Sequence, residues 1–276
     1  MSNIDSKLNI HHSLKQGFLY VAIGQSYVLE AIESAKTLKK CDPTVSIALV
    51  SNTEIGQEDV FDSVIVQSFD EKNSEDAWKL HMEYKTLGMK FSPYEKTIFL
   101  DTDTDTYIYE SIEHLFLLLN YNDMLICPDY AEGSLVKLDG VTHHGYVPYN
   151  TGVIGYKKNE RQNDFFDLWL KEFKININDY RGQQPSFIIA LMQKDLKVYS
   201  LPSVYNFRIK QFISIHKGTV KIFHGRHSNM SKVSQLINST NRHRGWNPNK
   251  WKLEYWGDKP FQERLMELFD SVKRLV

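Results

Sequence analysis

Residues 96–109, KTIFLDTDTDTYIY, decide the fold, because an apolar run leads directly into three alternating aspartates. The run over residues 97–100 has the length and composition of a buried β-strand. Its end places Asp101, Asp103 and Asp105 at one edge of a sheet. Carboxylates this close repel one another unless a cation lies between them, and hard oxygen ligands on a short loop suit Mg²⁺ or Mn²⁺. The motif predicts a divalent metal site; the alternative is an acidic turn that caps the next helix.

Strand-like and helical segments alternate on the N-terminal side of this motif. The sequence predicts strands at residues 17–23, 45–50, 63–66 and 97–100. Helical patterns lie between them, at residues 26–40 after the first strand and 77–89 before the last. Such alternation predicts an α/β domain, in which helices flank a mostly parallel sheet and ligands bind outside the carboxyl ends of the strands. We therefore expect residues 22–27 and 101–106 at one edge of the sheet.

Similar patterns continue on the C-terminal side. They predict helices near residues 111–119, 161–173 and 185–193, and strands at 124–127, 152–156, 198–201 and 220–223. Residues 241–256, NRHRGWNPNKWKLEYW, are basic and aromatic, and the pattern of an amphipathic helix follows them. We expect a flexible N-terminus over residues 1–16, one α/β domain over 17–228 and an appendage over 229–276.

The composition bounds the class of protein. With 276 residues, of which 42% are hydrophobic, the chain is large enough for one α/β domain with an appendage. The formal net charge is −1, and acidic and basic residues are interspersed. Proteins that bind the phosphate backbone usually carry a clear basic excess, so nucleic acid is not the expected partner.

Cysteine usage and hydropathy indicate the compartment. Cys41 and Cys127 are far apart and lack metal-ligand spacing, so we expect no disulfide framework and a reducing environment. The N-terminal sequence lacks the apolar core of a signal peptide, and no run approaches the ~18 apolar residues of a spanning helix. We expect a cytoplasmic protein. Residues 241–256 are expected to belong to a domain-closing appendage, and the alternative is a surface that docks on an anionic membrane at its inner face or on a partner.

An Asp-x-Asp motif after a buried strand resembles the metal motif of the GT-A fold of nucleotide-sugar glycosyltransferases. Most of residues 17–227 resembles glycosyltransferase family 8, the group of glycogenin and the bacterial galactosyltransferases. Lys85 precedes Asp101 by sixteen residues, which is the spacing of a family lysine before its first metal aspartate. The residues that stand where the family contacts uracil are Ala22, Ile23 and Tyr27.

Further matches lie downstream. In YNTGVIGY, residues 149–156, Asn150 corresponds to the asparagine of a strand that lines the donor sugar. Asp129 resembles an aspartate that binds sugar hydroxyls. His224 precedes a glycine, as does the family's late metal-ligand histidine. The resemblance implies a Mn²⁺ or Mg²⁺ site with ligands from Asp101, Asp103, Asp105 and His224.

The spacing of the metal motif allows two registers. Counting forward from Lys85 makes Asp101 and Asp103 the metal pair. Counting back from SIEHLF, residues 111–116, makes it Asp103 and Asp105 instead. Asp103 belongs to both pairs.

The chain departs from the family in the segment RGQQPSF, residues 181–187. Gln183 stands where the family has a carboxylate near the reacting sugar carbon. The neighbouring Gln184 is expected to bind the donor. A glutamine can be neither a carboxylate nucleophile nor a base. The family's late lysine to the phosphates is also missing, and Arg226 or His227 is expected in that role.

The resemblance implies a metal-dependent hexosyltransferase. Its donor is a nucleotide-diphosphate sugar, with UDP as the expected nucleotide, and its acceptor is a glycan, a lipid or a protein. The metal would bridge the donor phosphates and stabilise the departing diphosphate. Retention of the anomeric configuration needs no enzyme base, whereas inversion needs one, from Glu132, His143 or His144. The expected catalytic residues are Lys85, Asp103, Asn150 and Gln183.

Three alternatives stay open at this point. Because Gln183 replaces a carboxylate, the chain could bind a nucleotide sugar with little or no turnover. A phosphatase of the haloacid-dehalogenase type also has Asp-x-Asp after a strand, although its motif lies near the N-terminus. A sugar nucleotidyltransferase shares the general fold, but its glycine-rich phosphate loop should follow the first strand, where AIGQSY has neither a cation nor repeated glycine.

Overall fold

The computed structural model describes residues 14–55, 60–68, 77–102, 106–129, 136–138, 141–143, 148–176 and 183–255. Asp103, Asp105, Glu132, His144 and the predicted terminal helix lie outside these residues.

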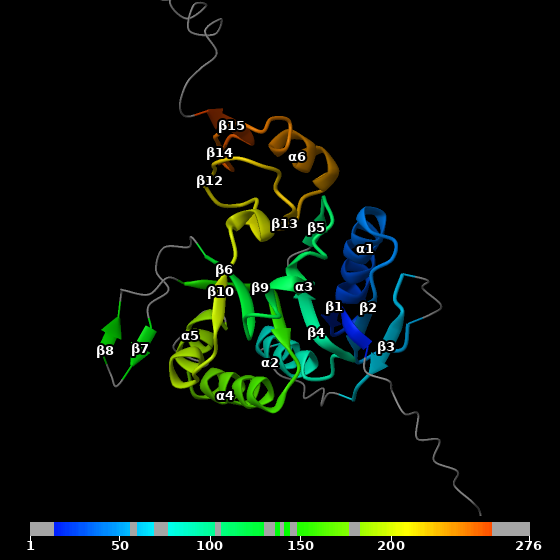
Figure 1. Ribbon diagram of the computed structural model, residues 1–276, viewed down its shortest axis with the longest axis vertical. Helices are drawn as coiled ribbons and strands as arrows, with labels where there is room; N and C mark the ends of the chain where they lie inside the picture. The colour runs from blue at the N-terminus through cyan, green and yellow to red at the C-terminus, as the bar shows by residue number, and fades with distance from the viewer. Residues whose placement is uncertain are drawn as a thin grey trace, which may run out of the picture.

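A seven-stranded sheet in the order β10-β6-β9-β4-β1-β2-β3 forms the centre of the fold (Figure 1). Its strands are β1 (Leu14–Ala22), β2 (Ile47–Ser51), β3 (Ser63–Val66), β4 (Tyr94–Leu100), β6 (Met124–Pro128), β9 (Tyr149–Lys157) and β10 (Val198–Ser200). β9 runs antiparallel to β4 and β6, and the other neighbouring pairs are parallel. The predicted mixed, mostly parallel α/β sheet is confirmed.

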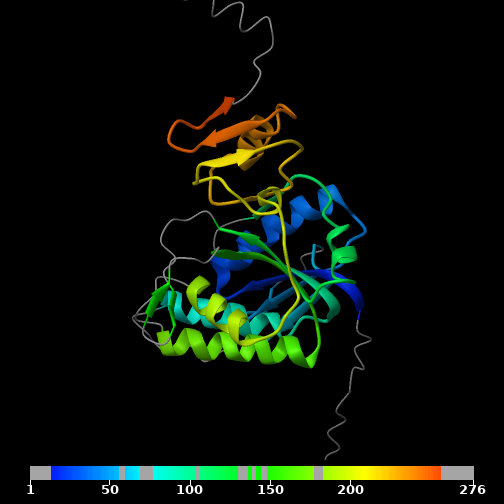
Figure 2. The same cartoon turned by 60° about the vertical axis from the view of Figure 1, so that its left-hand side comes forward.

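Helices cover both faces of this sheet. They are α1 (Gln25–Cys41), α2 (Ala77–Met89), α3 (Leu115–Leu118), α4 (Glu160–Asn176) and α5 (Gln184–Gln193). In Figure 2, α1 and α3 lie on one side of the sheet, and α2, α4 and α5 lie on the other. Alternate β1 residues serve the two cores: Phe18 and Tyr20 belong to the cluster on the α1 side, whereas Leu19 and Val21 belong to the cluster on the other face, where Val21 lies against Gly88 of α2.

The N-terminal helix follows its sequence pattern closely. The buried residues of α1 include Val28, Ile32, Ala35 and Leu38, the stripe expected for a helix on a sheet. Gly24 precedes the helix with φ 91°, a conformation that favours glycine, and its N–H donates to Asn52 Oδ1 at 2.8 Å. This turn fixes the chain at the carboxyl end of β1.

The helix predicted over residues 111–119 is shorter than expected. α3 covers only Leu115–Leu118, and the turns before it are closed by i→i+3 bonds such as Leu115 N–H to Ile112 O at 3.0 Å. The tighter turn replaces the first α-helical bonds, so the predicted start was wrong. Strand predictions are mostly correct to within about three residues, the usual uncertainty of strand ends.

A smaller unit lies on the carboxyl edge of the central sheet, at the top of Figures 1 and 2, where its C-terminal part is drawn from yellow to red and β5 in green. One of its sheets contains β11 (Phe207–Arg208), β13 (Ile222–His224) and β5 (Thr106–Ile108), and the other contains β12 (Ile213–Ile215), β14 (Arg244–Asn247) and β15 (Lys252–Tyr255). The unit also contains η1 (Ser203–Tyr205) and α6 (Met230–Ile237). The hairpin of β7 (Val136–Leu138) and β8 (Val141–His143) lies elsewhere, beside α5 (Figure 1).

Residues on both sides of the expected boundary at 229 share one apolar cluster in this unit. Its members include Phe207, Ile213, Phe223, Val233 and Trp246. The division into two domains therefore stays a prediction, and the described part of the appendage packs together with β11–β13.

A buried arginine holds this unit together. The Arg244 guanidinium donates to the carbonyl oxygens of Ile237 at 2.7 Å, Arg242 at 2.9 Å and Gly218 at 3.0 Å. Arg244 is fully buried, so losing its donors would leave these carbonyls poorly paired. We expect Arg244→Met to lower the free energy of unfolding in urea by about 1–3 kcal/mol. Lys250→Met, at an exposed position of the same unit, is the control, and an equal loss in both variants would contradict this account.

Candidate functional site

A pocket of about 200 Å³ opens at the carboxyl edge of the central sheet, where β4, β9 and β13 meet. It is lined by Met82, Lys85, Asp101, Asn150, Thr151, Gly152, Gln183, Gln184, Arg208 and His224. Six of these ten residues were expected in the site from the sequence. The fold therefore brings together residues from both halves of the chain.

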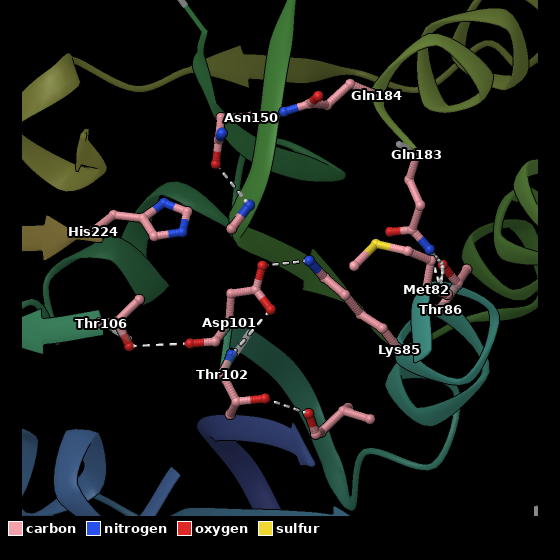
Figure 3. A network of polar contacts seen from close by, with 12 residues as sticks. Met82, Lys85, Thr86, Asp101, Thr102, Thr106, Asn150, Gln183, Gln184 and His224 are labelled. Carbon is pink, nitrogen blue, oxygen red and sulfur yellow. Dashed lines mark hydrogen bonds and ion pairs between the residues drawn. The ribbon is translucent and has the colours of Figure 1, made fainter. Parts of the chain in front are cut away.

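An ion pair forms the floor of the pocket. Lys85 Nζ, from α2, donates to Asp101 Oδ2 at the end of β4 (Figure 3). The two residues are only 2% and 4% exposed, and Asp101 Oδ1 also accepts from Thr102 N–H at 3.0 Å. Buried charges are stable when they are paired and hydrogen-bonded, so each residue depends on the other. The sequence spacing of sixteen residues thus corresponds to direct contact.

An irregularity in β9 gives the pocket its second wall. Pairing between β6 and β9 jumps from Ile126–Ile154 to Cys127–Asn150, so Thr151 and Gly152 lie in a bulge. Bulges re-aim side chains and are frequent beside active sites. Here the bulge turns Asn150, Thr151 and Gly152 toward the pocket.

A buried carboxylate organises the polar groups behind this wall. Asp129 Oδ2 accepts from Asn150 Nδ2 at 3.2 Å, Gln184 Nε2 at 3.0 Å and Arg208 Nη1 at 3.1 Å. Its Oδ1 accepts from Gln211 Nε2 at 3.2 Å. These bonds hold Asn150, Gln184 and Arg208 in fixed orientations around one charge.

The histidine from the C-terminal half is held by amides. His224 Nδ1 lies 2.7 Å from Asn206 Oδ1, and Asn206 Nδ2 donates to Asn150 Oδ1 at 2.8 Å. Gly152 N–H donates to the same Asn150 oxygen at 2.9 Å. A Cβ on Gly152 would lie 2.3 Å from His224 Cε1, so only glycine leaves room for the imidazole.

Gln183 directs a buried acceptor toward the pocket. Its Nε2 donates to the Met82 carbonyl and to Thr86 Oγ1 at 3.1 Å, which fixes the amide orientation. Among the residues that the structure describes, Gln183 Oε1 has no hydrogen-bond donor, although the side chain is buried. In Figure 3 this oxygen points into the space between Gln184 and Lys85. Buried acceptors usually have a partner, so a ligand hydroxyl suits this position.

Besides Asp129, which lies behind the wall, four described residues that were expected at the donor site are not part of the lining of the 200 Å³ pocket. Ala22 is buried at the end of β1, and Ile23 follows it half-buried. The Tyr27 ring stacks on His81 with centroids 4.1 Å apart and an interplanar angle of 22°. The exposed Arg226 Nη2 donates to Glu30 Oε2 at 2.8 Å. The roles expected for them toward uracil and phosphate stay predictions.

The donor set suits a divalent ion of the predicted kind. Asp101 and His224 line the same pocket and supply one carboxylate and one imidazole. Oxygen and imidazole ligands are compatible with Mn²⁺, and carboxylates with Mg²⁺. Asp103 and Asp105 lie outside the described residues. Within the described residues, no three His, Cys, Asp or Glu side chains form a metal-binding group.

A thiol near the site is unsuited to nucleophilic chemistry. Burial raises the pKa of the Cys127 thiol far above its ordinary value, and its Sγ lies 3.6 Å from the Pro202 carbonyl oxygen. Nucleophilic cysteines need the thiolate form. Cys127 therefore acts as a core residue.

Sequence reasoning missed Asn206, Arg208, Gln211 and Thr86. Arg208 lies in β11, a two-residue strand with no readable period, and Asn206 and Gln211 lie close to it in the sequence. Thr86 follows Lys85 on α2, where it resembles any other polar residue of a helix. Their contacts to residues 129, 150 and 183 arise only from tertiary packing.

No family model matches this chain, and no curated protein matches its sequence. Solved structures do match. The galactosyltransferase LgtC, in complex with donor and acceptor sugar analogues, aligns with a TM-score of 0.51 at 13% identity and covers 85% of this chain and 93% of that chain.

The chain has the GT-A fold. Two further matches are an active-site glutamine-to-glutamate mutant of LgtC and a glycosyltransferase involved in glycosylation of the major capsid of PBCV-1. The first has a TM-score of 0.48 at 16% identity, covering 76% of this chain and 87% of that chain. The second has a TM-score of 0.48 at 10% identity, covering 82% and 100%. Across the described ranges, no helix has both the length and the apolar character needed to cross a membrane.

Proposed function

We propose that the protein is a glycosyltransferase that moves a hexose from a nucleoside-diphosphate sugar, with UDP as the nucleoside diphosphate, onto a glycan, lipid or protein acceptor. One observation carries the proposal. The GT-A fold brings Lys85, Asp101, Asn150 and His224 into a single pocket at the edge of the sheet where ligands of α/β proteins bind. That arrangement supports a donor site.

The proposed reaction depends on a divalent ion. Mn²⁺ or Mg²⁺ would be held by His224 together with Asp103 and either Asp101 or Asp105, and it would supply Lewis-acid stabilisation of the departing diphosphate. Asp101 and His224 line one pocket, which supports the register that pairs Asp101 with Asp103. Lys85 adds a fixed positive charge beside them.

The polar groups of the pocket suit sugar recognition. Asn150 and Gln184 are oriented by Asp129, and Gln183 Oε1 presents an acceptor from the opposite side. Hydroxyl groups of a hexose offer both donors and acceptors, which such amides can match. We assign these residues to the donor sugar.

The transfer is proposed to retain the anomeric configuration. Gln183 is neutral and cannot form a covalent intermediate as a carboxylate would. The Asp101 carboxylate already accepts from Lys85, and the Asp129 carboxylate accepts from four side chains. A route in which a departing phosphate oxygen accepts the acceptor's proton needs no base from these residues.

Ligand-induced stabilisation tests the donor site. We expect one nucleoside diphosphate, UDP, to raise the melting temperature only when Mn²⁺ is present. At 100 times its dissociation constant the ligand adds about 2.7 kcal/mol to stability, a readily measured shift. Asp103→Asn should lose the effect, while GDP, CDP and phosphate serve as comparison ligands. If no diphosphate shifts the melt with or without metal, the proposal fails.

A second candidate is a nucleotide-sugar-binding protein that has lost turnover, which the position of Gln183 favours. It shares the binding behaviour above but not the chemistry. Slow hydrolysis of the donor in the absence of an acceptor distinguishes the two, because a protein without turnover releases no free sugar.

A further inference from the structure

Four polar side chains form a hydrogen-bonded series behind the pocket: Asp129, Asn150, Asn206 and His224. The direction of the first hydrogen bond, from donor to acceptor, is fixed because an ionised carboxylate only accepts. Asn150 must therefore turn its Nδ2 toward Asp129, at 3.2 Å. Its Oδ1 accepts from the Gly152 N–H at 2.9 Å, and a backbone N–H only donates. The orientation of the Asn150 amide is thus fixed from both ends.

The orientation of the Asn150 amide decides the orientation of the Asn206 amide. Because Asn150 presents an oxygen, Asn206 must approach it with Nδ2, at 2.8 Å. The Asn206 oxygen then points away, to His224 Nδ1 at 2.7 Å. An amide oxygen cannot donate, so the proton of that bond belongs to His224 Nδ1. In the neutral imidazole, Nε2 then carries the lone pair.

We propose that Asn206 is a positioning residue. Its amide, oriented through Asn150 and Asp129, accepts the Nδ1–H of His224 and so keeps Nε2 as the nitrogen that binds the divalent ion. The inference rests on the proposed function for the identity of the ion. Metal-binding histidines commonly donate their second N–H to an acceptor that fixes tautomer and ring orientation. Here the acceptor is a neutral amide, with the charge of Asp129 two residues further along the series.

The backbone holds both partners in place independently of this bond. Asn206 precedes β11, whose Phe207 and Arg208 pair with Phe223 and His224 of β13. Asn206 N–H also donates to Ser203 O at 3.0 Å, which closes the turn of η1. A change in the Asn206 side chain should therefore alter the hydrogen bonding of His224 while its main chain stays where it is.

The tautomer can be read without metal or nucleotide. In protein labelled with ¹⁵N-histidine at about pH 8, above the ordinary imidazole pKa, a long-range ¹H–¹⁵N spectrum distinguishes protonated from unprotonated ring nitrogens. His224→Gln identifies the His224 signals among the 10 histidines. We expect protonated Nδ1 and unprotonated Nε2 in the wild type. Protonated Nε2 would overturn the inference.

Two variants separate the roles of the Asn206 amide. Asn206→Leu removes both contacts at similar volume, so His224 should shift toward the Nε2–H form and Mn²⁺ affinity should fall about 10–100-fold by calorimetry. Asn206→Asp keeps an acceptor for Nδ1–H and should keep the tautomer. Asn206→Ser takes the place of Asn206→Leu if the latter does not fold. A Leu or Ser variant with wild-type tautomer and affinity would contradict the proposal.

The outcomes also separate this inference from the proposed function. A wild type with the Nδ1–H tautomer that binds no Mn²⁺, with or without UDP, overturns the metal dependence and the role of Asn206 toward the ion. A wild type that binds Mn²⁺ and UDP but loses neither tautomer nor affinity in Asn206→Leu overturns only the positioning role.

Discussion

Lys85→Met is expected to lower the free energy of unfolding by about 3–5 kcal/mol, the usual cost of removing one partner of a buried ion pair. The variant leaves the Asp101 carboxylate, which also accepts from Thr102 N–H, in a site that is almost closed to water and without its lysine counter-charge. Urea unfolding of the variant and the wild type, extrapolated to zero denaturant, measures the difference.

Two further variants make this test specific to the buried pair. Lys85→Met combined with Asp101→Asn removes the stranded charge and should recover a large part of the loss. Lys36→Met breaks an exposed ion pair with Glu33 and should change stability by no more than about 0.5 kcal/mol. If Lys85→Met costs as little as Lys36→Met, Asp101 does not depend on Lys85.

Gly152→Ala is expected to have the largest effect on the chemistry. The new methyl group would lie 2.3 Å from His224 Cε1 and 2.8 Å from Asn150 Oδ1, so the imidazole must move out of its position. Displacing a reacting group by about 1 Å can reduce a rate by about 100-fold. We expect a loss of that size in donor hydrolysis, together with loss of the Mn²⁺-dependent melting shift.

Gly155→Ala in the same strand is the matched control. Its methyl group would meet Leu125 Cδ1 at 2.9 Å, a contact in the core and away from the pocket. Overpacking of this kind costs about 1–3 kcal/mol of stability, and the same range is expected for Gly152→Ala. The two variants should therefore be similar in stability and different in turnover. Equal turnover would show that Gly152 does not control the position of His224.

The central sheet could be predicted from the sequence because its inner strands, such as β2, β4 and β9, contain apolar runs that are buried on both faces. β2 is buried at every position, and the stripe on α1 has the period of a helix. The small sheets could not be predicted in the same way. β11 has two residues and β12 has three, too few to show any period, and their pairing partners are distant in the sequence.

The candidate site was predictable where a motif carried it. Lys85, Asp101, Asn150 and His224 were expected together, and the structure places them in one pocket. Tyr27 was expected to face a nucleobase, and its described partner is the ring of His81. Nothing in the local sequence distinguishes Asn206 from other turn asparagines, because its role depends on contacts with Asn150 and His224.

The pairing of β5 with β13 also has a consequence for biosynthesis. Thr106, just after the aspartate motif, pairs with His224, so these two parts of the site are separated by roughly 120 residues of chain. Translation proceeds at about 5–20 residues per second, so His224 is added on the order of ten seconds after Thr106. Contacts of such long sequence separation also form slowly. A growing chain that already carries the three aspartates therefore has no complete pocket, and it can gain one only when nearly the whole sequence has been made.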